Sequence, residues 1–234
     1  MIVDLVTRAV QDAETANTKQ LQEAAELVLG SLRADGLVFT AGAGHSLAAV
    51  AETFYRAGGL ASVHPLYHPE LLPLHGARSS TKAERRTGLA AEVLAAVAPG
   101  PDDVLVVFST SGVNPYPVEL ARAARAAGTP VIAVGSRASV AAAPKRSSST
   151  LIDEADVVLD TGIRPGDASF PPENPRTAAL STVLNAFLWN AVLARLVSAA
   201  GADVPLWVSS NVPGGDEANA ALFARYQPRI PQLG

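Results

Sequence analysis

The sequence predicts a doubly wound α/β domain, in which a mainly parallel sheet of five strands lies between two layers of helices. Three observations lead to this fold class. Short, continuous apolar runs, such as residues 104–108 and 130–134, are typical of strands covered on both faces. Segments with helical periodicity alternate with these runs, as in right-handed βαβ units. A glycine-rich turn directly follows the first run, at 41–46.

The first element is a helix. Apolar residues recur at helical spacing over 21–32, and we expect this amphipathic helix to extend back towards Asp4. Gly36 ends it. Apolar runs and helical spacing then alternate as far as residue 199. The strands are expected at 37–40, 62–66, 104–108, 130–134 and 155–159, and the further helices at 47–54, 86–97, 117–127 and 177–199.

These elements are expected to form one domain that covers residues 1–234. Its core spans about 21–200, preceded by the helical extension and followed by a tail at 201–234. Residues 136–150 are rich in Ala, Ser, Arg and Lys, and 162–175 are rich in Pro and Gly, so both are expected to be surface loops. Neither loop separates two hydrophobic cores.

Composition excludes several classes of protein. The chain has 234 residues, 48% of them hydrophobic and 17% charged, unlike a disordered chain. With no cysteine, it has neither disulfides nor Cys-ligated metals nor thiolate catalysis. A net charge of −4 argues against a nucleic-acid partner. No targeting segment is visible, so we expect a cytoplasmic protein. The apolar stretch 178–200 is expected to be a core helix with no membrane partner, because it carries polar side chains that are costly in lipid: Ser181, Thr182, Asn185, Asn190 and Arg195.

Two loops have the composition of an anion site. Ligands of open α/β sheets bind beyond the carboxyl ends of the strands, where both loops are expected. Glycines allow backbone N–H groups to approach a ligand, and serine and threonine hydroxyls are neutral donors suited to phosphate. Either loop alone could instead be a simple turn or a helix cap. The candidate ligand-binding residues are Gly42, Gly44, His45 and Ser46 in the first loop, and Ser109, Thr110, Ser111, Gly112 and Asn114 in the second.

Both loops carry a family resemblance. Residues 42–46 (GAGHS) are similar to the first Gly-x-Gly-x-Ser loop of SIS (sugar isomerase) domains, and 108–112 (FSTSG) to their Ser-x-Ser-Gly loop. Residues 55–60 and 211–217 further resemble a bacterial branch of that family. The resemblance covers roughly 21–200 and implies a flavodoxin-like, three-layer αβα fold that binds phosphosugars. It also implies that the phosphate is held by Ser46, Ser109, Thr110 and Ser111.

Acid–base candidates are few. Glu52 lies six residues after Ser46 and is expected within reach of a bound sugar, although it could equally form a surface ion pair with Arg56. Residues 68–76 are similar to the His-Pro…His-Gly stretch of arabinose 5-phosphate isomerases, which implies a catalytic-site role for His75; the alternative is an exposed loop histidine. Glu70, Glu119 and Asp167 are weaker candidates. The spacing of His64, His68 and His75 fits no standard pattern of metal ligands, so no metal is expected.

These residues predict a sugar-phosphate isomerase that interconverts an aldose and a ketose through an enediol, without metal or organic cofactor. Glu52 is the candidate carbon base and His75 the candidate oxygen shuttle. The alternative is a non-catalytic phosphosugar sensor or regulatory module. A Rossmann-type nucleotide binder would need an acidic residue near the end of the 62–66 strand, where there is none. The resemblance also implies a homodimer or homotetramer, in which a partner subunit can supply a site residue.

Overall fold

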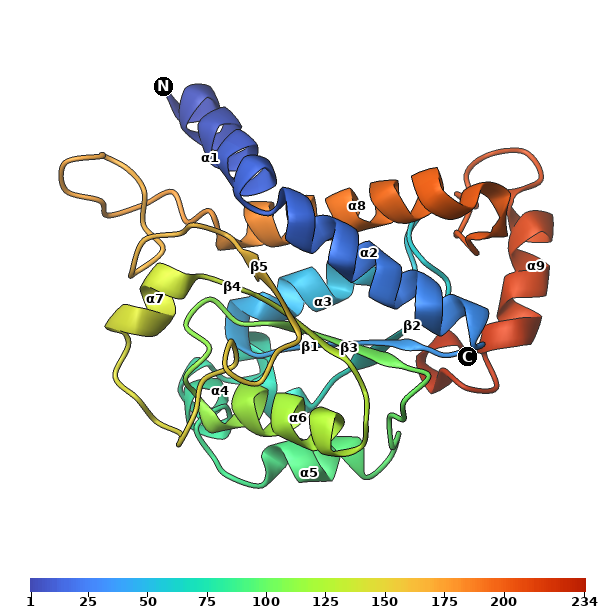
Figure 1. The fold of residues 1–234 in the computed structure, drawn as a ribbon, viewed down its shortest axis with the longest axis horizontal. Coiled ribbons are helices and arrows are strands. Elements are labelled where there is room, and N and C mark those ends of the chain that lie inside the picture. The colour runs from blue at the N-terminus through green and yellow to red at the C-terminus, as the bar shows by residue number, and fades with distance from the viewer.

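The computed structural model describes residues 1–234 and contains one five-stranded sheet in the order β2-β1-β3-β4-β5, with every neighbouring pair parallel (Figure 1). The predicted α/β fold class is confirmed. The chain passes from β1 to the edge strand β2 and then returns to form β3 on the other side of β1. The carboxyl ends of β1 and β3 are therefore the switch point at which such sheets bind ligands. The strands are β1 (Val38–Gly42), β2 (Val63–Leu66), β3 (Val104–Phe108), β4 (Val131–Gly135) and β5 (Val157–Asp160).

Helices cover both faces of the sheet. Figure 1 shows α2, α3 and α8 on one face and α4, α5 and α6 on the other, while α1 projects from the body at one end. This arrangement follows from crossovers that change face where the strand order reverses. The helices are α1 (Ile2–Ala16), α2 (Thr18–Arg33), α3 (Leu47–Thr53), α4 (Ala77–Ala83), α5 (Leu89–Leu94), α6 (Pro115–Ala126), α7 (Arg137–Ala142), α8 (Ser181–Ala200) and α9 (Gly215–Tyr226).

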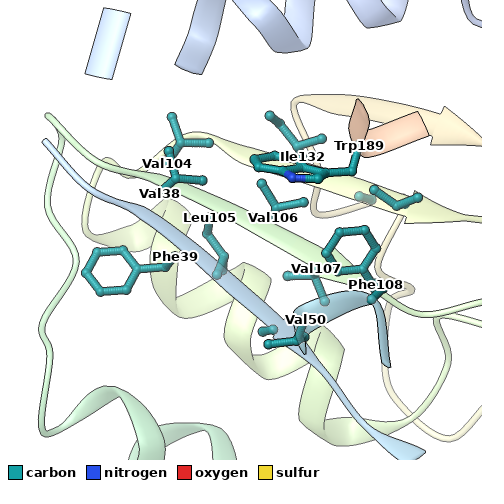
Figure 2. Packing of buried hydrophobic residues seen from close by; sticks show 14 of the residues in the cluster. Val38, Phe39, Val50, Val104, Leu105, Val106, Val107, Phe108, Ile132 and Trp189 are labelled. Atoms are coloured by element: carbon teal, nitrogen blue, oxygen red, sulfur yellow. The ribbon is translucent and has the colours of Figure 1, made fainter. Parts of the chain in front are cut away.

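The central strands are buried along their whole length. Side chains of β3 alternate between the two faces, and Val106 points to the face that carries Trp189 of α8 (Figure 2). Helix α8 is apolar enough, with a mean hydropathy of 1.5, and long enough to cross a membrane by length and composition alone. In this fold it packs against α2 and α1, with Leu188 and Leu196 fully buried. The apolar stretch expected in the core is indeed a helix of the core.

The expected continuous helix from about Asp4 to residue 32 is wrong in one respect, because it breaks at Asn17. The Asn17 side-chain amide donates to the Ala13 carbonyl (2.6 Å) and to the Asp160 carbonyl (2.7 Å). Its Oδ1 accepts from the Asp160 N–H (2.7 Å). The buried amide thus pairs with the backbone at the end of β5, and the chain turns there into α2. This contact joins residues 143 positions apart, so local periodicity could not predict it.

Four other elements differ from expectation, among them α4 (Ala77–Ala83), a helix in a stretch for which the sequence predicted none. The helix expected at 86–97 is shortened to Leu89–Leu94, since Gly88 and Ala98 take left-handed φ values of 87° and 42° on either side of it. The loop expected at 136–150 contains α7, whose N-terminus is capped by Ser136 as acceptor from the Ser139 N–H. The tail at 201–234 carries α9, which the sequence reading missed.

Candidate functional site

The two predicted loops meet at the carboxyl edge of the sheet. In the register of β1 and β3, Gly42 lies beside Phe108, so the chain leaves both strands at the same level. A cavity of about 360 Å³ opens there. Its lining includes residues from both loops, from the end of α4, from α7 and from the segment before α8: Ala43, His45, Ser46, Glu84, Ser109, Thr110, Ser111, Asn114, Ser139, Ala142, Ala143, Pro165, Gly166, Asp167 and Ser181.

The first loop turns tightly into a 3-10 turn at Gly44–Ser46 before α3 begins. The Ser46 N–H donates to the Ala43 carbonyl at 3.1 Å. A Cβ atom at Gly42 would lie only 2.9 Å from the Ser46 carbonyl oxygen, so only glycine allows the strand end to approach the turn this closely. This close approach brings Ser46 over the end of β1, on the wall of the cavity.

The second loop is built around Gly112, whose φ of +55° is strained for other residues. The Gly112 N–H donates to Ser109 Oγ at 3.2 Å, and the Gly112 carbonyl accepts from the Leu151 N–H at 2.8 Å. Helix α6 then begins after Asn114. The loop is therefore fixed from both sides, with Ser109, Thr110 and Ser111 along the cavity.

The cavity presents neutral donors. Among the side-chain hydroxyls of the two loops, only that of Ser109 makes a hydrogen bond within the chain. No lysine or arginine belongs to the lining set. The N-terminus of α6 offers no free N–H group either, because Pro115 and Pro117 have none and the Tyr116 N–H donates to the Glu84 carbonyl. The donors open to a phosphate group in this cavity are therefore the free hydroxyls.

Glu84, at the carboxyl end of α4, is the cavity residue that the sequence reading missed. Its carboxylate is half-buried, and burial raises its pKa above the ordinary glutamate value. The positive charges of Arg85 and Arg146 and the amide of Asn114 act in the opposite direction. A carboxylate that faces a ligand cavity and whose pKa is raised by burial is the usual form of a general base or acid. Nothing in the sequence near Glu84, such as a strand end or a glycine loop, could have marked it.

Asp167 also lines this cavity, and its backbone is in a left-handed conformation with φ of 58°. Its Oδ1 accepts from the N–H groups of Leu180 and Ser181, both at 3.0 Å. The carboxylate therefore caps the N-terminus of α8 and holds the 165–167 segment beside the cavity. Of the two carboxylates that line the cavity, Asp167 has a structural task and Glu84 does not.

The predicted catalytic pair lies outside the cavity lining. Glu52, near the end of α3, forms an ion pair with Arg56 one turn later, which is the alternative raised from the sequence. His75 is exposed, and its Nδ1 lies 3.2 Å from the Pro69 carbonyl. Nothing in this structure tests their roles, which stay predictions.

The other candidates are distributed as follows. Gly42, Gly44 and Gly112 shape the loops without lining the cavity, whereas His45, exposed at its mouth, does line it. Glu70 pairs with Arg86 (3.6 Å), and Glu119 accepts from the Gly88 N–H (2.8 Å). Both of these carboxylates are engaged on the surface, away from the two loops.

Comparison with known proteins agrees with this geometry. The sequence profile of the SIS domain matches residues 3–136. A UPF0309 protein of Listeria monocytogenes serotype 4b is 35% identical over 99% of this chain and 97% of its own, and one of Brucella anthropi is 37% identical over 91% and 89%. Among solved structures, phosphoheptose isomerase of Neisseria gonorrhoeae superposes with a TM-score of 0.53 and 26% identity, covering 84% of this chain and 95% of that one. A phosphoheptose isomerase of Francisella tularensis, at 18% identity and the same TM-score, shares the fold.

Proposed function

The chain belongs to the SIS-domain family, and on that premise we propose that it is a sugar-phosphate isomerase that interconverts an aldose and a ketose through an enediol. One observation carries the proposal. A single cavity holds the hydroxyls of Ser46 and of Ser109, Thr110 and Ser111 together with the half-buried carboxylate of Glu84. The hydroxyls suit the phosphate of the substrate, and the carboxylate suits proton transfer at its carbons.

The chemistry needs a base for the carbon and a group that moves protons on the oxygens. In the open-chain aldose, the Glu84 carboxylate removes the proton from C2. The electron pair of that C–H bond forms the C1–C2 double bond of the enediol, while the π pair of the C1 carbonyl moves to O1, which takes up a proton. Loss of the O2 proton then forms the C2 carbonyl as the double-bond pair takes the proton from Glu84 at C1, which gives the ketose without an oxidant. His45 lines the same cavity and would carry the proton between O1 and O2. Acid–base catalysis of this kind contributes about 10²–10⁴-fold.

This assignment moves the base from Glu52 to Glu84. A general base must reach the proton that it abstracts, and Glu84 lines the cavity whereas Glu52 is held by Arg56 outside the lining. No metal or organic cofactor is needed, because the step is proton transfer alone. The likeness to a phosphoheptose isomerase at 26% identity supports a phosphorylated aldose as substrate. We also propose that the chain works as a homodimer or homotetramer in the cytoplasm, as expected from the family.

The test is exchange of the C2 proton. The protein is incubated in D₂O with a panel of aldose and ketose phosphates of five to seven carbons, and proton NMR follows the C2 signal. We expect one substrate to lose the signal while its isomer accumulates. The matched control is Ser111→Ala, which should raise KM, since it removes a phosphate donor that has no structural bond.

Two results would contradict the proposal. The first is no exchange with any member of the panel while a sugar phosphate still raises the melting temperature, which identifies a non-catalytic binding module. The second is neither exchange nor stabilisation, which removes the phosphosugar site itself.

A further inference from the structure

We propose that Arg146 is a positioning residue of this site, which orients the Asn114 amide in the cavity wall that it shares with Glu84. Arg146 stands in the segment 144–149 between α7 and β5, outside the cavity lining. The role of Glu84 in this inference rests on the proposed function, whereas the contacts of Arg146 and Asn114 do not depend on it.

The first step is the contact between Arg146 and Asn114. Arg146 Nη1 donates to Asn114 Oδ1 at 3.1 Å, and the Asn114 side chain is 6% exposed. An arginine can only donate, so it must face the oxygen of the amide. This contact fixes the orientation of the Asn114 amide, so its NH₂ group points away from Arg146.

The second step joins Asn114 to Glu84. Both residues line the cavity, and the Tyr116 N–H in the first turn of α6 donates to the Glu84 carbonyl at 3.2 Å. The end of α4 is thus tied to the start of α6, where Asn114 is the N-cap. The Asn114 amide lowers the pKa of Glu84, against the larger raising effect of burial. Arg146 is thus bonded to an amide that lines the same cavity as the Glu84 side chain.

The charges that face Glu84 come from several elements. Arg85 follows it directly in the chain, Arg146 approaches from the 144–149 segment, and Asp167 and His45 line the same cavity. Arg85 and Arg146 both lower the pKa of Glu84, against the raising effect of burial. Only Arg146 also acts through a neutral amide in the cavity wall, because it alone is bonded to Asn114.

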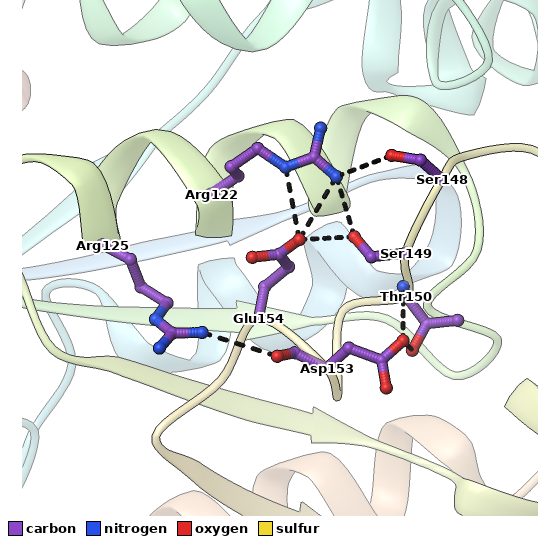
Figure 3. Close-up of polar contacts among 7 residues, drawn as sticks. All are labelled: Arg122, Arg125, Ser148, Ser149, Thr150, Asp153 and Glu154. Atoms are coloured by element: carbon purple, nitrogen blue, oxygen red, sulfur yellow. Dashed lines mark hydrogen bonds and ion pairs between the residues drawn. The ribbon is translucent and has the colours of Figure 1, made fainter.

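The segment that carries Arg146 is anchored by a polar network on α6 (Figure 3). Arg122 Nη2 donates to Ser148 Oγ (3.0 Å) and Ser149 Oγ (2.8 Å), and both Arg122 and Ser149 are bonded to Glu154. Thr150, the next residue, donates its backbone N–H and its hydroxyl to Asp153 Oδ2. The network fixes residues 148–150, just after Arg146, and so holds the Arg146 guanidinium in position to contact Asn114.

The consequence concerns the pH below which activity is lost. A base works only while it is unprotonated, so activity falls where Glu84 takes up a proton. If Arg146 favours the carboxylate, then removing its charge raises the pKa of Glu84. Activity in Arg146→Gln must then be lost at a higher pH than in the wild type, while activity well above that range is kept.

The experiment compares Arg146→Gln with Lys145→Gln. Both remove one positive charge from the same segment, but Lys145 neither lines the cavity nor belongs to the charges that act on Glu84, and it acts instead on Asp153. The profile of kcat/KM against pH is measured for each with the substrate found in the exchange assay. We expect Arg146→Gln to lose about threefold to tenfold more activity on the acid limb than at alkaline pH, and Lys145→Gln to follow the wild type. Arg122→Gln, which loosens the anchor, should give a smaller change of the same sign.

A second readout is independent of turnover. In protein labelled with ¹³C at glutamate side chains, the carboxyl signal of Glu84 is identified by its loss in Glu84→Gln and titrated in each variant. A midpoint raised by Arg146→Gln but not by Lys145→Gln supports the inference even if no substrate is found and the proposed function fails. An unchanged midpoint, or equal changes in both variants, would overturn it.

Discussion

The two edges of the sheet use polar groups in opposite ways. At the amino edge, the Asp103 carboxylate accepts from the Leu37 N–H (2.7 Å) and the Gly100 N–H (2.8 Å), so both of its oxygens serve the backbone. At the carboxyl edge, the hydroxyls of Ser46, Thr110 and Ser111 line a cavity without a bond inside the chain.

This contrast separates structure from function. Polar groups that are paired inside the chain stabilise the fold, whereas preorganised donors that are left free are available to a ligand. Substitution of the paired Asp103 should therefore change stability, whereas substitution of the free hydroxyls should change binding or turnover.

The largest effect is expected at the carboxyl edge, in Glu84→Gln. The amide keeps the shape of the side chain but cannot accept the carbon proton, so kcat should fall by about 10²–10⁴-fold. Thermal stabilisation by the sugar phosphate should persist, since the phosphate donors are intact.

Glu52→Gln is the matched control for that change. It breaks an exposed i,i+4 ion pair with Arg56, which contributes only about 0.3–0.5 kcal/mol to stability. Activity should stay within about twofold of the wild type, a margin that corresponds to roughly 0.4 kcal/mol. A large loss in Glu52→Gln together with full activity in Glu84→Gln would return the base to the residue expected from the sequence.

The sequence marks the two loops of the cavity but not Glu84, and one physical reason accounts for both. Strand ends are marked locally, because apolar runs such as Val104–Phe108 stop at a polar, glycine-containing loop. Because β1 and β3 are parallel neighbours, the loops that follow them lie at the same edge of the sheet. Glu84 reaches the cavity only because α4 is tied to α6 through the Tyr116 N–H, a contact across 32 residues that no local pattern records.

A smaller effect, on stability instead of activity, is expected for Asp103→Asn at the amino edge. Asparagine can accept from one of the two N–H groups and turns its own NH₂ towards the other. The free energy of unfolding, measured in urea, should fall by about 1–3 kcal/mol, while the Kd for the sugar phosphate stays unchanged.

Ser111→Ala should show the reverse pattern. Its hydroxyl has no partner in the chain, so stability should stay within about 0.5 kcal/mol of the wild type, while the Kd should rise roughly tenfold. Equal effects of the two substitutions on stability would erase the distinction between the edges.

The smallest effect is a pH dependence of stability from His64. This histidine is buried on β2 against Phe39, with ring centroids 5.1 Å apart, and its Nδ1 has no partner. Burial lowers its pKa. As the pH falls below about 6.5, the unfolded chain takes up a proton that the folded chain resists, so stability is lost between that pH and the lower pKa of the folded state.

The measurement is the free energy of unfolding from pH 8 to pH 5. His64→Leu should lose this part of the pH dependence, while His75→Leu, at an exposed histidine, should keep it. Parallel curves for the wild type and His64→Leu would show that the buried imidazole carries no such effect.

The most direct test of the central claim is a titration of ¹⁵N-labelled protein with the sugar phosphate that stabilises it best. The free hydroxyls at the carboxyl edge should receive the phosphate, so saturable shifts should appear first at the backbone amide signals of Ser46 and of residues 109–112. The amides of Leu37, Gly100 and Asp103 at the amino edge should not move. Saturable shifts confined to any other part of the chain, with the two loops unchanged, would contradict the account.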